Sequence, residues 1–76
     1  MDKKVFLLDR EHYTKEQVEN LTEKDLEEWV AEESYTEDFT IIKIDANDYS
    51  TPEAAIEGEG GGFYDIDDYY VFSFGF

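Results

Sequence analysis

The sequence predicts a single acidic α/β domain over residues 1–76, in which a small three-stranded sheet carries two to three helices in the order β-α-α-β-α-β. Three observations indicate this class: three short runs with strand composition, helix-start signals between them, and a hydrophobic fraction of 41% that is sufficient for a core. An α+β arrangement of the same elements stays open. Because helices separate the first two strands, we expect these strands to be parallel, with the helices on one main face of the sheet.

Strand composition marks residues 3–8, 39–45 and 69–74. The first run is short and continuously apolar, as in a buried strand. The other two alternate, and the faces so defined carry Ile42 and Ile44 in the second run and Tyr70, Phe72 and Phe74 in the third. The third run gives the strongest strand signal, but its direction in the sheet is not predicted.

Threonine begins each expected helix. Thr14 forms a capping box with Gln17 and predicts a helix over 15–20, and Thr22 starts a longer one over 23–33. Thr51 precedes a proline, which is favoured in the first turn, and predicts a third helix over 52–57. The glycine-rich residues 58–62 are expected to form a flexible loop.

Composition excludes several classes of protein. The chain has no cysteine, which excludes disulfides, thiolate nucleophiles and cysteine-bound zinc, and favours a reducing compartment such as the cytoplasm. No apolar run approaches the roughly 20 residues that span a bilayer. The apolar run after Lys3 and Lys4 is also shorter than a signal-peptide core, so we expect a cytoplasmic protein.

No catalytic or cofactor motif emerges. His12 is the one histidine, and the glycine run lacks the preceding strand and following lysine of a phosphate-binding loop. The acidic runs at Asp45 and Asp65 fail the EF-hand pattern, because a tyrosine stands at the fifth position of each. We therefore expect no enzyme, no cofactor and no metal centre, with weak divalent-cation binding kept as a minor alternative.

Charge is the most unusual property of the chain. The formal net charge is −15, yet residues 1–24 hold six acids and five bases, whereas residues 25–76 hold fifteen acids and Lys43 alone as a base. This asymmetry argues against nucleic acid or an anionic membrane as a direct partner, since both would be repelled. It favours a basic protein.

Acids and tyrosines alternate through the second helix and the region beyond it. Tyrosine is common at interfaces because it joins a large apolar face to a polar tip. We expect the carboxylates to replace phosphates against a basic, nucleic-acid-binding protein, with the tyrosines as apolar anchors. A purely solvated acidic face is the competing interpretation. The candidate partner-binding residues are Glu27, Glu28, Glu32, Glu33, Tyr35, Glu37, Asp38, Asp48, Tyr49, Tyr64, Asp65, Asp67, Asp68 and Tyr69.

In size and charge the chain resembles the small acidic nucleic-acid-mimic inhibitors of phages and mobile elements, including some anti-restriction and anti-CRISPR proteins. The resemblance covers no motif and assigns no residue. An alternative function is that of a structural or accessory domain, which would pair or form a homodimer through the aromatic strand at 69–74. Salt distinguishes the two, because only an electrostatic complex weakens steeply with ionic strength.

Overall fold

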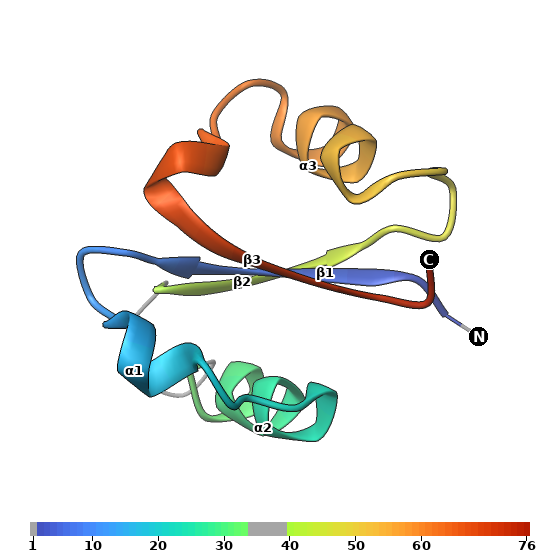
Figure 1. Ribbon diagram of the computed structural model, residues 1–76. Helices are drawn as coiled ribbons and strands as arrows, with labels where there is room; N and C mark the ends of the chain where they lie inside the picture. The colour runs from blue at the N-terminus through green and yellow to red at the C-terminus, as the bar shows by residue number, and fades with distance from the viewer. Residues whose placement is uncertain (1, 34–39) are drawn as a thin grey trace.

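The computed structural model describes residues 2–33 and 40–76 and confirms a mixed α/β globule with the expected order of elements. Its strands form one sheet in the order β2-β1-β3 (Figure 1). The elements are β1 (Lys4–Asp9), α1 (Lys15–Val18), α2 (Glu23–Glu33), β2 (Ile41–Asp45), α3 (Pro52–Gly60), the 3-10 helix η1 (Ile66–Asp68) and β3 (Tyr69–Phe74).

The central strand β1 is antiparallel to both of its neighbours, with Leu7 opposite Ile42 on one side and Val71 on the other. The expectation that the first two strands are parallel is therefore wrong. Two helices rather than one connect them. The first helix, α1, and the turn after it lead the chain back toward the start of β1, where Glu23 of α2 pairs with Lys4. Helix α2 then runs along the same face of the sheet toward the end of β1 (Figure 1). As a result β2 begins beside the end of β1.

Helices cover both faces of the sheet, so the expectation of one main helical face is also wrong. On one face, α1 and α2 enclose a core of Phe6, Leu8, Val18, Leu26 and Ile41. On the other, α3 closes a second core of Val5, Leu7, Ile44, Ala46, Ala55 and Ile56 (Figure 1). The four consecutive apolar residues 5–8 of β1 are fully buried because alternate side chains enter opposite cores.

The expected helix starts are confirmed in detail. Thr14 and Gln17 form the reciprocal capping box, and Thr51 accepts a hydrogen bond from the backbone N–H of Ala54 at 3.2 Å. Thr22 and Asp25 form a second reciprocal pair, with both hydrogen bonds between 3.1 and 3.2 Å. These local bonds satisfy N–H groups that have no partner inside the helix.

Helix α3 is longer than expected, because two glycines of the supposed loop are helical. A Cβ atom at Gly58 would overlap the ring of Tyr49, and one at Gly60 would overlap the ring of Tyr64. The glycines thus let two aromatic rings lie against the helix. The helix ends at Gly60, and Gly61 caps it with a φ of 55°, a left-handed conformation that glycine adopts at low cost.

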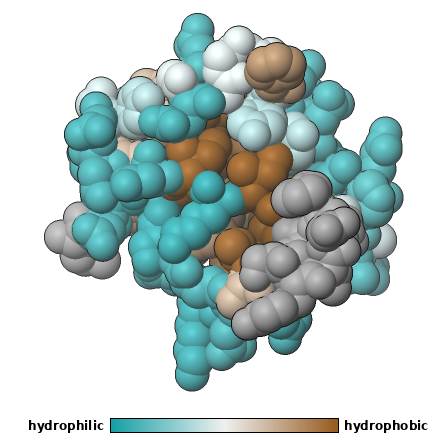
Figure 2. Space-filling model, turned by 180° about the vertical axis from the view of Figure 1, so that it is seen from behind, coloured by the Kyte–Doolittle hydropathy of each residue, from teal (hydrophilic) through white to brown (hydrophobic). Residues whose placement is uncertain are grey.

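On the face opposite to the view of Figure 1, hydrophilic side chains surround a smaller area of apolar atoms (Figure 2). Most of the described acidic side chains are exposed, and those within ion-pair distance of a cation are few. Among these few, Glu23 and Glu27 both belong to α2, so the two helical faces of the sheet differ in how their carboxylates are paired.

Candidate protein-binding surface

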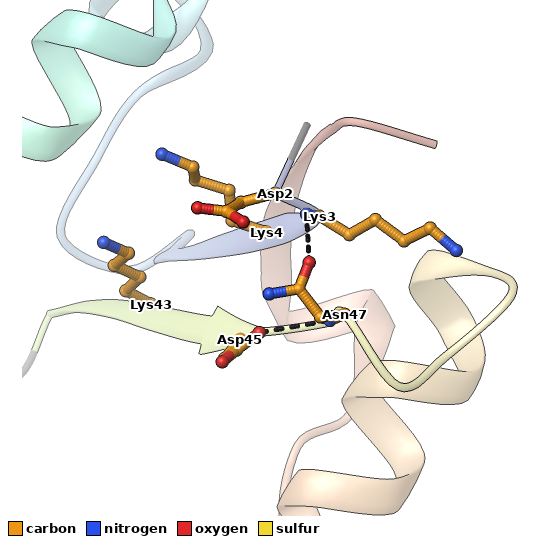
Figure 3. Close-up of a pocket in the computed structure, with 6 residues that line it drawn as sticks. All are labelled: Asp2, Lys3, Lys4, Lys43, Asp45 and Asn47. Carbon is orange, nitrogen blue, oxygen red and sulfur yellow. Dashed lines mark hydrogen bonds between the residues drawn. The ribbon is translucent and has the colours of Figure 1, made fainter.

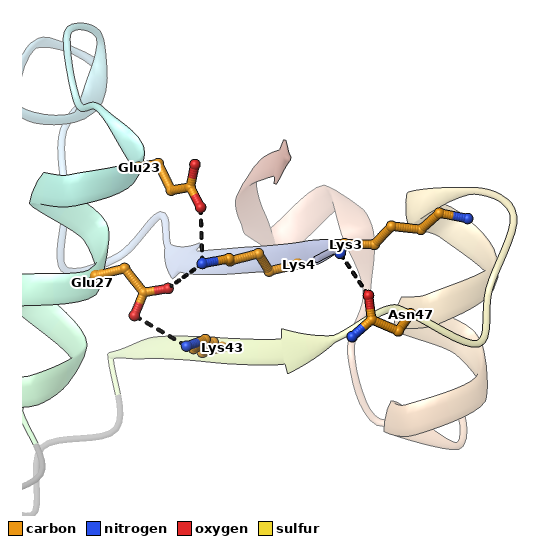
Figure 4. A network of polar contacts seen from close by, with 6 residues as sticks. All are labelled: Lys3, Lys4, Glu23, Glu27, Lys43 and Asn47. Atoms are coloured by element: carbon orange, nitrogen blue, oxygen red, sulfur yellow. Dashed lines mark hydrogen bonds and ion pairs between the residues drawn. The ribbon is translucent and has the colours of Figure 1, made fainter. Parts of the chain in front are cut away.

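An ion-pair network joins α2 to the sheet. The Nζ atom of Lys4 lies 2.8 Å from a carboxylate oxygen of Glu23 and 2.9 Å from one of Glu27, and the other oxygen of Glu27 lies 3.0 Å from Nζ of Lys43 (Figure 4). The two lysine hydrogen bonds lower the pKa of Glu27, and the hydrogen bonds to the two glutamates raise the pKa of Lys4. This part of the acidic surface is therefore locally compensated.

The network separates the candidate acids of α2 into two groups. Glu27 bridges two strands through their lysines, which gives it a structural role. Glu28 and Glu32 are exposed, so they are open to a partner. Tyr35, Glu37, Asp38 and the side chain of Glu33 lie outside the described residues.

The lysines also border a hollow of about 200 Å3, formed by Asp2, Lys3, Lys4, Lys43, Asp45 and Asn47 (Figure 3). Lys3 extends away from Lys4 and Lys43, and its Nζ donates to the backbone oxygen of Tyr49 at 3.0 Å. Asn47 accepts from the backbone N–H of Lys3, and Asp45 accepts from that of Asn47. Lys4 and Lys43 are already paired with Glu27, Lys3 extends the other way, and carboxylates line the same hollow, so the hollow does not form an anion site.

The part of the chain that follows Lys43, which includes α3, has a different charge pattern. After Lys43 the sequence contains eight acids and no lysine or arginine. In the described structure, no carboxylate of this region is within ion-pair distance of a cation. The eight acids are Asp45, Asp48, Glu53, Glu57, Glu59, Asp65, Asp67 and Asp68.

A shallow groove of about 250 Å3 runs between α3 and the segment that enters η1. Three carboxylates, those of Glu53, Glu57 and Asp65, border it together with three apolar side chains. The α3–η1 surface, as we use the term below, consists of these lining residues and the adjacent Phe63. The lining residues are Glu53, Ile56, Glu57, Gly62, Tyr64, Asp65 and Ile66.

Two large apolar side chains of the α3–η1 surface face solvent. Phe63 is 90% exposed and Ile66 is 41% exposed. Phe63 follows the turn at Gly61 and Gly62, which places it beside the groove rather than in the core. Exposed large apolar groups next to a groove are typical of interaction sites.

The candidate tyrosines Tyr49, Tyr64 and Tyr69 are partly buried and pack against the core below α3. The hydroxyl of Tyr49 donates to Glu59 at 3.0 Å, which raises the pKa of Tyr49. Burial is the main cause of the raised pKa of Tyr69, whose ring meets that of Tyr64 edge-on at 6.0 Å. These rings form the framework of the surface, whereas Phe63 protrudes from it.

The acids of η1 lie beside an arginine. Asp67 and Asp68 border a second hollow of about 240 Å3 with Arg10, which donates from Nε to the backbone oxygen of Tyr69 at 3.1 Å. The Asp65 side chain accepts from the backbone N–H of Asp67 at 3.0 Å and so caps η1. Asp48 is exposed on the turn after β2.

Sequence reasoning included Glu53 and Glu57 only as members of the acidic region 45–68, and it did not include Ile56, Phe63 or Ile66. Glu53 and Glu57 stand four residues apart and therefore on one face of a helix, a spacing that could have identified them. Ile56, Phe63 and Ile66 carried no comparable signal, because an apolar residue near a core is usually buried in it.

Comparisons with models of protein families, with curated proteins and with solved structures gave no match to this chain. Within residues 2–33 and 40–76, no group of three or more histidine, aspartate or glutamate side chains is arranged to hold a metal ion. None of the helices described has the length and apolar character that crossing a membrane requires.

Proposed function

We propose that this protein is a binding module that docks its α3–η1 surface on a basic protein. The observation that supports this most directly is the groove itself, where Glu53, Glu57 and Asp65 border apolar side chains and no described cation pairs with them. On the α2 face, by contrast, Lys4 and Lys43 pair with Glu23 and Glu27. The carboxylates of the α3–η1 groove therefore remain available to a partner.

The chemistry of the groove suits lysine and arginine side chains. Both have long aliphatic stems that pack on apolar surface while the charged head reaches a carboxylate. Ile56, Tyr64 and Ile66 offer the apolar surface, and the neighbouring carboxylates offer acceptors. Phe63 adds an exposed aromatic ring. Aromatic residues are enriched in the buried centre of protein–protein interfaces.

The finer proposal is that the partner is a nucleic-acid-binding protein. Such a protein presents a basic groove built for phosphates, and a rigid array of carboxylates can occupy it. Occupation would exclude the nucleic acid, so the module would act as an inhibitor. The net charge of −15 supports fast, electrostatically steered association with such a partner.

The test is capture from a nuclease-treated lysate at low and at high salt, followed by competition. The proposal predicts a basic protein that is bound at low salt and released at high salt. It also predicts that the purified partner loses bound nucleic acid when this chain is added. Capture that ignores salt, or a partner that binds nucleic acid and this chain together, would contradict the proposal.

A further inference from the structure

The outer edge of β3 is open. In the sheet order β2-β1-β3 it has a described neighbour on one side only, and no element lies in front of it in Figure 1. The backbone N–H of Arg10 donates to the oxygen of Asp68, which sets the hydrogen-bonding pattern between β1 and β3. Since this pattern alternates, Tyr69, Val71 and Ser73 direct their backbone groups outward.

One of these three residues is already satisfied. The N–H of Tyr69 bonds to the oxygen of Ile66, and its carbonyl accepts from Arg10. Val71 and Ser73 have outward groups with no strand to pair with among the described residues. Val71 is also 38% exposed, because α3 packs over β1 and β2 rather than over β3.

Nothing in β3 protects this edge. Proteins usually block an edge strand with charged side chains, proline or a bulge. The other edge, β2, carries Lys43 and Asp45, whereas Tyr69–Phe74 contains no charge and no proline. An uncharged edge strand of four aromatic residues with Val71 and Ser73 is well suited to add another strand.

We propose that a second copy of this chain adds its β3 to this edge, in antiparallel orientation, to form a six-stranded sheet. A twofold axis that passes through Phe72 aligns the same faces of the two copies and places Val71 of each opposite Ser73 of the other. Tyr70 then faces Phe74. Each exchange between Val71 and Ser73 forms two backbone hydrogen bonds.

Each end of β3 carries charges of both signs. Asp67 and Asp68 precede the strand and lie beside Arg10, whereas Asp2 and Lys3 lie at its other end, with the ammonium group of Lys3 5.6 Å from the ring centre of Phe76. Antiparallel pairing brings Asp67 and Asp68 of one copy to the end that carries Lys3 of the other, and Arg10 to the end that carries Asp2. A second copy therefore offers groups of opposite sign at both ends of the strand, which favours it over an unrelated strand.

The first test is the concentration dependence of molecular mass, measured by sedimentation. Val71→Pro removes an outward N–H and no bond to β1, so we expect it to raise the dimer dissociation constant at least about tenfold. Val71→Thr keeps the N–H and the β-branch and should leave dimerisation nearly unchanged. Circular dichroism checks that both variants fold. A monomer at all concentrations up to about 1 mM would overturn the proposal.

The second test addresses the register. In the double variant Val71→Lys/Ser73→Lys, like charges oppose each other in the dimer, whereas in Val71→Lys/Ser73→Glu opposite charges do. We expect the first variant to be monomeric and the second to dimerise. Net charge alone predicts the reverse order, since two added lysines relieve the repulsion between acidic chains. That reverse order, or equal behaviour, would exclude this register.

The dimer does not depend on the basic partner, and salt separates the two proposals. Added salt screens the repulsion between two chains of charge −15 and should strengthen the dimer, whereas it should weaken a complex with a basic protein. Either proposal can therefore fail without the other.

Discussion

The two helical faces of this protein carry carboxylates under different conditions. On the α2 face, Glu23 and Glu27 are held by Lys4 and Lys43 and fix the helix to the sheet. On the α3–η1 surface, Glu53, Glu57 and Asp65 have no described cation within ion-pair distance, and they border apolar side chains. The two faces therefore differ in the distribution of counter-charges and not only in the number of acids. Our proposal that a basic partner docks on the α3–η1 surface depends on this difference.

The largest expected effect comes from reversing charge on α3. The double variant Glu53→Lys/Glu57→Lys should weaken binding to the basic partner at least about 100-fold, because it replaces two carboxylates of the groove with cations. The dissociation constant, measured by calorimetry at fixed salt, provides the check.

A matched control exists on the other face. Glu28 and Glu32 are also exposed and four residues apart on a helix, so Glu28→Lys/Glu32→Lys changes the net charge by the same amount. We expect it to cost no more than about tenfold, through long-range attraction alone. If this control costs as much as the α3 variant, binding follows total charge, and the distinction between the faces is lost.

A smaller effect tests how the groove is built. Gly60→Ala should lower the free energy of unfolding by about 1–3 kcal/mol, since the added methyl overlaps the Tyr64 ring. In a Tyr64→Ala background the same change should stabilise the protein by up to about 1 kcal/mol, because alanine is the better helix former. Urea unfolding of the four proteins measures the cycle. A loss of stability in both backgrounds would show that the ring is not the cause.

Truncation of the exposed aromatic group isolates the apolar part of the surface. Phe63→Ala should weaken partner binding about tenfold. Because the side chain is 90% exposed, the free energy of unfolding should change by less than about 0.5 kcal/mol. An unchanged affinity would restrict the interface to the carboxylates.

The smallest effect concerns the α2 network. Glu27→Gln should lower stability by up to about 1 kcal/mol at neutral pH, the range for partly exposed ion pairs, whereas Glu28→Gln should change it little. The lysines lower the pKa of Glu27 in the folded state. Its contribution is therefore complete above the ordinary pKa of glutamate and is lost as the pH falls through the lower folded value. Thermal melts of both variants across this range test the difference, which should disappear in acid.

Local signals in the sequence were sufficient for the helix starts and the strands. The side chains of three threonines, Thr14, Thr22 and Thr51, each accept a hydrogen bond from a backbone N–H only three residues further along the chain. These hydrogen bonds could therefore be predicted without knowledge of the fold. The alternation of residues 70, 72 and 74 likewise reflects the pleat of one strand.

Features that depend on distant contacts could not be predicted in the same way. Gly58 and Gly60 have low helix propensity, yet both are helical, and the rings of Tyr49 and Tyr64 occupy the space that a Cβ atom would take at these positions. The strand directions depend on a path through two helices. The pairing of Glu27 with lysines of two strands, which separates it from Glu28, also exists only once α2 has packed.

The most direct measurement is an amide NMR titration of the labelled chain with the basic partner recovered at low salt. The account predicts that the largest shift changes fall on residues 53–68, with those of Phe63 and Ile66 among them, and that residues 23–32 change little. If the largest changes fall instead on α2, the carboxylates beside the lysine network form the interface, and the assignment to the α3–η1 surface is wrong.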